Sequence, residues 1–230
     1  MFVQEQPQAR LDVATITNEA SVLETRQVTA IESHRTMKKQ DVTILSVDMR
    51  GFTSLAERID PEQCVDLLNE YFAVAVEVVF EFGGEVDKFQ GDGFMAIFAD
   101  MGEGERHERR GVKCALHLRS IACSLNLPQL VGERIPLGMG INTGVAAIGK
   151  VGSKTRSDYT VIGDVVNVAH YLQRISGPDQ IIISENTRRC MGDDLECAPL
   201  GYVRVKRRVS RVEAFLIDSL PGYGRCRARF

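Results

Sequence analysis

The chain has 230 residues, of which 44% are apolar and 26% are charged, and its formal net charge at pH 7 is −3. This length and composition can bury the core of one large domain with at most a short appendage. The slightly negative net charge argues against nucleic-acid binding as the main role. No apolar stretch approaches the roughly 20 residues that a membrane-spanning helix needs, so we expect no membrane span.

Cysteine spacing and the N-terminal residues indicate the compartment. The six cysteines, at positions 64, 114, 123, 190, 197 and 226, contain no C-x-x-C pair. The first ten residues, MFVQEQPQAR, contain no apolar signal region. These features are typical of a reducing environment. We therefore expect a cytoplasmic protein.

Composition divides the chain into a polar lead-in at residues 1–40, a folded domain at 41–218 and a short basic tail at 219–230. The domain begins with a buried strand, DVTILSVD at 41–48, which runs into MRGFTSLAE. There Gly51 permits a tight turn, and Thr53 or Ser54 can cap a short helix. The strand therefore delivers Asp48 to a helix N-terminus.

A long helix and a hairpin follow. Pro61 begins the helix, whose apolar residues recur every three to four positions until Gly83-Gly84 ends it. Residues 85–99, EVDKFQGDGFMAIFA, place β-branched and aromatic runs on both sides of a Gly-Asp-Gly turn. This pattern predicts a hairpin with Asp92 at its tip.

The remaining elements complete the predicted fold. They are a helix near 101–125, strands at 135–144 and 145–152, the segment YTVIGDVVNVAHYLQRIS, and strands near 180–184 and at 202–217. This order of strands and helices predicts an α+β fold. Its sheet contains antiparallel pairs and carries the helices on one face.

Two carboxylates stand out in this arrangement. Asp48 ends the first strand and Asp92 occupies the hairpin turn, and a β-α-β-β order makes the first and second strands neighbours. The carboxylates can then converge and bind two hard cations. The N–H groups of Gly51, Phe52 and Thr53 are free to receive phosphate oxygens. This combination indicates nucleoside-triphosphate chemistry, and the alternative is two unrelated turn aspartates.

Four ordered segments resemble the class III nucleotidyl cyclase catalytic domain, the family of adenylyl and guanylyl cyclases. They are VTILSVDMRGFTSLAE, GGEVDKFQGDGFMAIF, GINTGVAAIGKVGSKTRSDYTVIGDVVNVA and VRVKRRVSRVEAFLI, between residues 41 and 217. The resemblance implies a ferredoxin-like βαββαβ core that works as a homodimer, with each active site built from both chains. It also implies two Mg²⁺ or Mn²⁺ as cofactors and a nucleoside triphosphate as substrate.

The resemblance gives each matching residue a role. Asp48, Asp92 and the Met49 carbonyl would hold the two metal ions, while Gly51, Phe52 and Thr53 would bind the phosphates. The partner chain would supply the remaining residues: Lys88 and Thr160 for the base, Asn167 for the ribose and Lys206 for the triphosphate. Without the resemblance, Lys206 is an ordinary solvated strand lysine and Asn167 belongs to a polar helix face.

One residue departs from the family pattern. The family commonly has Asn-x-x-x-Arg on this helix, with the arginine on the α-phosphate, but NVAHY places Tyr171 at that position. Arg174 shares a polar stripe with Asn167 and lies one turn further along the axis than Tyr171. It is the candidate replacement, with Arg50 and Arg156 as alternatives, and each of the three can also be an exposed arginine without this task. The opposite, apolar stripe consists of Val165, Val168, Leu172 and Ile175.

The choice of base depends on three residues. Lys88 argues against GTP, because guanylyl cyclases tend to have glutamate there. A threonine hydroxyl both donates and accepts, so Lys88 and Thr160 fit the N1 and N6 edge of adenine or the O4 and N3–H edge of uracil. Tyr171 in place of a flexible arginine would narrow the site towards a one-ring base.

These features favour a pyrimidine cyclase that converts UTP to cyclic UMP. A short chain without a recognisable sensor domain is similar to the stand-alone bacterial pyrimidine cyclases of antiphage signalling, whose product an effector reads. The effector for this chain is unknown. The alternatives are an adenylyl cyclase that makes cyclic AMP from ATP, and a catalytically weakened cyclase-like dimer that only binds nucleotide.

Overall fold

The computed structural model of the chain describes residues 37–100, 102, 104–124, 134–153, 155–205 and 211–220. Predictions for residues 1–36, for Lys206 and for the basic tail beyond residue 220 lie outside these ranges. The elements in chain order are β1 (Lys38–Met49), α2 (Phe52–Ala56), α3 (Pro61–Glu81), β2 (Glu85–Gln90), β3 (Gly93–Ala99), α4 (His107–Ser124), β4 (Leu137–Gly152), β5 (Ser157–Ile162), α6 (Asp164–Ile175), β6 (Ile181–Ser184), α7 (Glu185–Met191), the 3-10 helix η1 (Gly192–Asp194), β7 (Glu196–Val203) and β8 (Val212–Ser219).

An eight-stranded sheet organises the described residues, in the order β2-β3-β1-β4-β6-β8-β7, with β5 paired to β4 beside this path. β1 is antiparallel to both of its neighbours, β3 and β4, whereas β4 and β6 are parallel. The α+β class and the predicted hairpin are confirmed. β1 begins three residues before the predicted strand, inside the segment interpreted as a lead-in.

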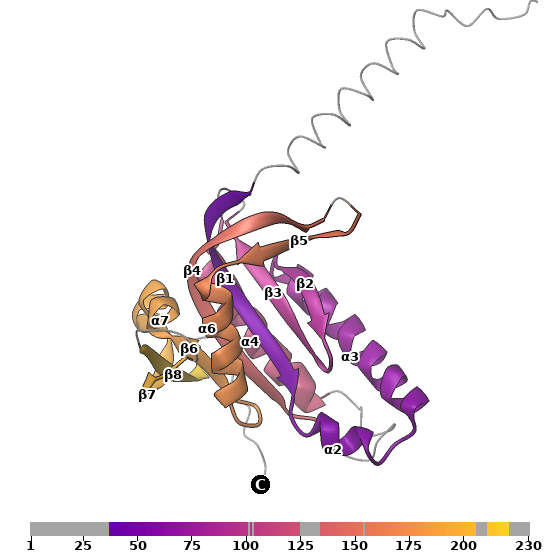
Figure 1. Cartoon of the computed structure of the whole chain (residues 1–230). Helices are drawn as coiled ribbons and strands as arrows, with labels where there is room; N and C mark the ends of the chain where they lie inside the picture. The colour runs from indigo at the N-terminus through magenta and orange to yellow at the C-terminus, as the bar shows by residue number, and fades with distance from the viewer. Residues whose placement is uncertain are drawn as a thin grey trace, which may run out of the picture.

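Helices cover both faces of this sheet, because its central strands are buried on both sides. Residues 42–47 of β1 are each exposed by 2% or less. On one face α3 and α4 pack over a cluster that includes Leu45 and Phe94. On the other face α6 packs over Ile44 and Met95 (Figure 1). The expectation of helices on one face is therefore wrong, since a strand without polar alternation needs cover on both sides.

α3 begins and ends where the sequence predicts. The Asp60 carboxylate accepts a hydrogen bond from the Glu62 N–H, and the Gln63 side chain accepts from the Asp60 N–H, which forms a capping box beside Pro61. Gly83, with a φ of 66°, turns the chain after the helix. α3 thereby places Tyr71 against β3, where its ring centroid lies 6.3 Å from that of Phe94.

β4 is one strand of 16 residues, and not two strands as predicted. At the expected break Gly144 stays in the ladder opposite Val42, so the strand continues. The far half of β4 carries β5, and the two strands form a ribbon that projects from the body of the domain (Figure 1). The sequence pattern does not predict β5, which places Thr160 opposite Gly149.

Candidate active site

The end of β1 and the tip of the β2–β3 hairpin lie at the same end of the sheet (Figure 1). Asp48 lies opposite Gly93 in the β1–β3 ladder, so the turn that carries Asp92 begins beside Asp48. The neighbour of β1 is β3, the second strand of the hairpin, and not β2 as expected. Gly93 permits this approach, because a Cβ there would collide with the Val47 carbonyl oxygen and would lie 3.3 Å from an Asp48 carboxylate oxygen.

Both carboxylates are disfavoured as anions at this position. Burial raises the pKa of Asp48, while the Arg50 guanidinium at 2.8 Å and a hydrogen bond with the Gln173 side chain lower it in part. Burial also raises the pKa of Asp92, and the negative charge of Asp48 raises it further. The two charges therefore repel each other, and a cation bound to both would relieve the repulsion.

The Tyr71 hydroxyl on α3 is a buried donor near this acidic pair. Tyr71 is 2% exposed, and its hydroxyl has no hydrogen-bond partner among the described residues. Burial raises the pKa of Tyr71, and the charges of Asp48 and Asp92 raise it further. A buried hydroxyl normally has a protein or water partner, so this donor calls for an acceptor close to the two carboxylates.

The donors at this end of the sheet fit hard divalent cations. Asp48 and Asp92 supply charged oxygens, and the Met49 side chain lies in the core, so Met49 could contribute only its backbone carbonyl. Within the described ranges no group of three or more His, Cys, Asp and Glu side chains could hold a metal. The other ligands would be water and substrate oxygens, as is usual for Mg²⁺. An ion-bound water would also give the Tyr71 hydroxyl its acceptor.

The predicted phosphate-binding residues lie in the turn that follows β1. Gly51 is the N-cap of α2 and has a φ of 84°, a conformation that glycine adopts without strain. α2 has no side-chain cap, so the expectation that Thr53 or Ser54 caps it is wrong. The first N–H groups of a helix have no intrahelical acceptor. The binding of phosphate by Gly51, Phe52 and Thr53 therefore stays a prediction.

Arg50 ties this turn to α6. Its guanidinium donates to the Asp48 carboxylate at 2.8 Å, to the Ser176 hydroxyl at 3.0 Å and to the Gln173 carbonyl. It also lies over Gly138, where a Cβ would collide with it. Because both terminal nitrogens of Arg50 are engaged inside the chain, we do not assign Arg50 to a phosphate group.

The two residues predicted to read the base lie together, although they come from β2 and β5. Lys88 Nζ donates to Thr160 Oγ1 at 2.9 Å. Thr160 Oγ1 in turn donates to Asp87 Oδ2 at 3.0 Å, and the same carboxylate oxygen lies 3.0 Å from Lys88 Nζ. The Asp87 side chain is 1% exposed, whereas that of Lys88 is 41% exposed. The three groups therefore form one hydrogen-bonded network, in which the Asp87 carboxylate is buried and the Lys88 ammonium is accessible.

Asp87 is not among the residues predicted from the sequence. Consecutive residues of a regular strand point to opposite faces. A β-bulge between Val86 and Lys88 breaks this alternation. It brings the side chains of Asp87 and Lys88 to the same hydroxyl group. An acidic residue directly before Lys88 is the one feature of the sequence that could indicate this network. The partner of Asp87, Thr160, is too remote in the sequence to be recognised from local spacing.

α6 carries the predicted polar stripe at its surface. Asn167 and Arg174 are exposed, and Tyr171 is half-buried. The Tyr171 ring packs against a hydrophobic cluster that includes Val168 and Leu172. Ile175, expected on the apolar side, is 39% exposed because the helix ends there. Lys206 lies outside the described residues.

His170, the neighbour of Tyr171, is a further polar residue near the predicted site. Its Nδ1 lies 3.1 Å from the hydroxyl of Ser46, which is buried on β1. Burial lowers the pKa of His170, and the positive charges of Arg174 and Lys88 lower it further. Burial and these two cations therefore both disfavour the protonated form of His170.

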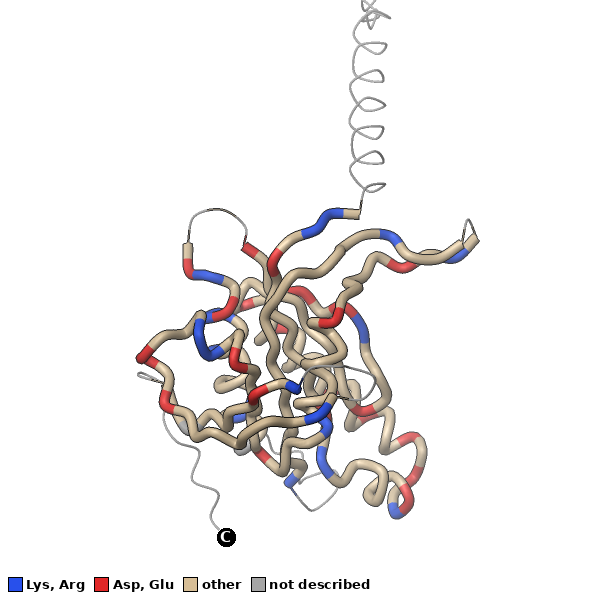
Figure 2. The backbone as a smooth tube through the Cα atoms, turned by 60° about the vertical axis from the view of Figure 1, so that its left-hand side comes forward, with Lys and Arg blue, Asp and Glu red and all other residues tan. Residues whose placement is uncertain are grey.

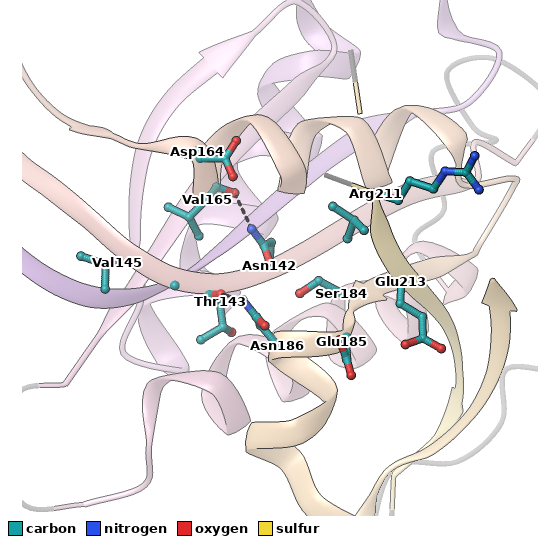
Figure 3. Close-up of a pocket in the computed structure, with 12 residues that line it drawn as sticks. Asn142, Thr143, Val145, Asp164, Val165, Ser184, Glu185, Asn186, Arg211 and Glu213 are labelled. Atoms are coloured by element: carbon teal, nitrogen blue, oxygen red, sulfur yellow. Dashed lines mark hydrogen bonds between the residues drawn. The ribbon is translucent and has the colours of Figure 1, made fainter. Parts of the chain in front are cut away.

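A separate pocket of about 320 Å³ lies beside the N-termini of α6 and α7 (Figure 3). Asn142 forms part of its wall and donates to the Val165 carbonyl at 3.0 Å. None of the predicted site residues lines this pocket. We therefore place the candidate active site at the end of β1 and along the β2 and β5 edge.

Comparison with known proteins identifies the family. Residues 35–219 match the family model described as the adenylate and guanylate cyclase catalytic domain. The chain belongs to this family, the class III nucleotidyl cyclase domains, as its fold and acidic pair indicate. The crystal structure of the adenylyl cyclase CyaB from P. aeruginosa has a TM-score of 0.76 and 31% identity, and covers 82% of this chain and 100% of that one. The guanylyl cyclase Cya2 has a TM-score of 0.74 and 30% identity, with 80% and 94% covered.

Curated relatives are longer proteins. Adenylate cyclase 1 of Rhizobium meliloti (strain 1021) is 31% identical over 182 residues, which are 77% of this chain and 27% of the relative. The adenylate cyclase of Anabaena cylindrica is 36% identical over 146 residues, which are 59% of this chain and 27% of the relative. The chain thus spans about a quarter of their length.

The distribution of charge and the hydropathy of the helices complete the description. Basic and acidic residues are interspersed along the described backbone, including the β4–β5 ribbon (Figure 2). No described helix combines the length and the hydropathy that crossing a membrane requires.

Proposed function

We propose that the chain converts a nucleoside triphosphate to a 3′,5′-cyclic nucleotide and pyrophosphate. The observation that carries this proposal is the convergence of Asp48 and Asp92 at one end of the sheet, in a domain of the cyclase family. These two carboxylates and the Met49 carbonyl would hold two Mg²⁺ or Mn²⁺. When bound, such ions lower the pKa of the ribose 3′-hydroxyl and neutralise the triphosphate.

The remaining residues bind and orient the substrate in this proposal. The turn of Gly51, Phe52 and Thr53 receives phosphate oxygens through its backbone N–H groups. Asn167 orients the ribose, and Lys206 binds the triphosphate. Arg174, exposed on the same helix as Asn167, stabilises charge on the α-phosphate in place of the arginine that Tyr171 replaces.

The proposed enzyme is a homodimer with shared sites. An open hollow of about 550 Å³ is lined by apolar side chains that include Phe80, Ile148 and Tyr159. Phe80 is 60% exposed and Tyr159 is 52% exposed, and exposed aromatic groups of this kind are typical of an interface. A second copy of the chain covers this hollow and brings its Lys88, Thr160 and Asn167 to the acidic pair of the first.

The proposed substrate is ATP. Lys88 can only donate a hydrogen bond, and it lies beside a threonine oxygen. This pair complements the N1 acceptor and the N6 amino donor of adenine. The same pair also fits O4 and N3–H of uracil, so the choice of ATP depends on the relatives named as adenylate cyclases.

UTP is the second candidate, because an aromatic ring at position 171 replaces the arginine of the family pattern. Tyr171 is half-buried on α6, and a ring that narrows the shared site would favour a one-ring base. The antiphage role expected of a pyrimidine cyclase belongs to this second candidate.

A product assay separates these candidates. Purified protein is incubated with each of the four ribonucleoside triphosphates and Mn²⁺, and the products are identified by mass. Cyclic AMP from ATP is the expected result, and Asp48→Asn serves as the inactive control. Cyclic UMP as the main product would establish the second candidate. If no triphosphate gave a product, the proposed catalytic activity would be contradicted, and the nucleotide-binding dimer would be the remaining alternative.

A further inference from the structure

Asp87 occupies an unusual place in the base-reading network. Its side chain is 1% exposed, so the residue is not available to contact substrate directly. One of its oxygens, Oδ2, receives both the Thr160 hydroxyl and the Lys88 ammonium at 3.0 Å. The two residues predicted to contact the base therefore share one buried acceptor.

The chemistry of the three groups fixes where the threonine proton lies. An ionised carboxylate only accepts hydrogen bonds, and an ammonium only donates them. Because Lys88 donates to Thr160 Oγ1, the threonine oxygen accepts on that side. Its single proton then goes to Asp87. Thr160 keeps one lone pair, and Lys88 keeps one of its three N–H donors.

We propose that Asp87 is a positioning residue that fixes the polarity of the Thr160 hydroxyl, so that the base meets one donor on Lys88 and one acceptor on Thr160. This inference rests on the proposed function and deepens it, since it names what distinguishes an amino group from a carbonyl group at position 6 of a purine. With the adenine ring in place, Lys88 donates to N1 and Thr160 accepts from the N6 amino group.

The arrangement rejects a purine that carries a carbonyl at position 6. In ITP the ring has the same shape as in ATP, but O6 faces the Thr160 lone pair and N1–H faces the Lys88 donor. Both contacts are then mismatched, and unpaired polar groups in a site are costly. Without Asp87 the threonine hydroxyl is free to rotate and donate to O6, which removes one of the two mismatches.

The test compares kcat/KM for ATP and ITP in matched variants. The wild type should favour ATP by about tenfold or more, and Asp87→Ala should reduce this ratio at least about fivefold. Asp87→Asn retains an oxygen that can accept the threonine proton and should keep the ratio near that of the wild type. Asp66→Ala, which removes an exposed carboxylate on α3, is the control and should change nothing.

A double-mutant cycle locates the effect at Thr160. Thr160→Val removes the hydroxyl and keeps the side-chain shape. In that background Asp87→Ala should leave the ATP to ITP ratio unchanged, because no hydroxyl remains to be oriented. A ratio in Asp87→Ala equal to that of the wild type, or an Asp87→Asn ratio as low as that of Asp87→Ala, would overturn the proposal.

Binding measurements keep the result independent of turnover. 3′-Deoxy-ATP and 3′-deoxy-ITP lack the attacking hydroxyl, and their Kd values can be measured by calorimetry with Mg²⁺. If the wild type forms no cyclic product, the proposed reaction fails. The ratio of the two Kd values then tests the role of Asp87 independently of the proposed reaction. Equal ratios in wild type and Asp87→Ala overturn that role, as does a wild type that binds neither nucleotide.

Discussion

At the scale of single residues, Asp48 and Asp92 hold more negative charge than their surroundings neutralise. Burial raises the pKa of each, and within the described residues Arg50 is the one positive side chain found to lower the pKa of both. A pair of this kind is a poor structural element, because replacing either acid by a neutral group removes repulsion. We propose instead that the pair serves to bind cations.

The first prediction concerns turnover. Asp48→Asn and Asp92→Asn should each lower cyclic nucleotide formation by at least about 100-fold, because each removes a charged metal ligand. Turnover is measured with saturating Mn²⁺, and circular dichroism checks that both variants fold. Asp66→Asn on α3 is the matched control. Retained turnover in either variant would remove the assignment of metal ligands.

The second prediction concerns stability and pH. The folded-state pKa of Asp92 is raised, so its carboxyl contributes stability below the unfolded pKa and loses that contribution as the pH rises through the folded pKa. Without divalent ions, Asp92→Asn should therefore have a higher Tm than the wild type at pH 7. The difference should vanish below about pH 4. Mg²⁺ should raise the Tm of the wild type more than that of the variant. A lower Tm for Asp92→Asn at pH 7 in EDTA would contradict this account.

At the scale of elements, α6 is seated on β4 at a glycine. A Cβ at Gly140 would collide with backbone atoms of α6, namely the Ala169 carbonyl oxygen and the Gln173 nitrogen. Neither atom can move without shifting the helix. The position of Asn167 and Arg174, which α6 carries, therefore depends on a residue that touches no substrate.

Gly140→Ala should for this reason destabilise the fold by about 1–3 kcal/mol, the usual range for overpacking a core. It should also weaken turnover, because α6 is displaced. Gly144→Ala in the same strand is the control, since its Cβ would meet Val165 at an ordinary 3.7 Å. Urea unfolding of both variants gives the comparison. Equal free energies of unfolding for Gly140→Ala and Gly144→Ala would contradict this prediction, because they would show that α6 can move away from β4 at little cost.

The elements also show what can be predicted from sequence. The first strand, the capped helix from Pro61 and the Gly-Asp-Gly hairpin depend on local patterns, and all three are confirmed. The cover on both faces and the strand β5 depend on pairings between distant segments. Asp87 was missed for the same reason, because its role arises from a bulge and from Thr160, which lies 73 residues further along the chain.

At the scale of the whole molecule, the proposed dimer allows a complementation test. An Asp48→Asn chain lacks a metal ligand but keeps Asn167, and an Asn167→Ala chain has the reverse defect. When the two variants are mixed in equal amounts, random exchange of subunits should make about half of the dimers mixed. Each mixed dimer has one intact site out of two, so about a quarter of the wild-type activity should return. Each variant alone should remain inactive. No recovery after subunit exchange, verified by size and mass, would exclude shared sites.

The start of β1 is connected through β4 to Thr160, the residue proposed to contact the base. Lys38 and Lys39 pair with Ile148 and Ala147 of β4, and the opposite edge of the same β4 segment pairs with β5. Met37 lies on Gly149, where a Cβ would meet its sulfur at 2.6 Å, and Gly149 is the ladder partner of Thr160. A displacement of the chain at residue 37 would therefore reach Thr160, the proposed base contact, through the single strand β4.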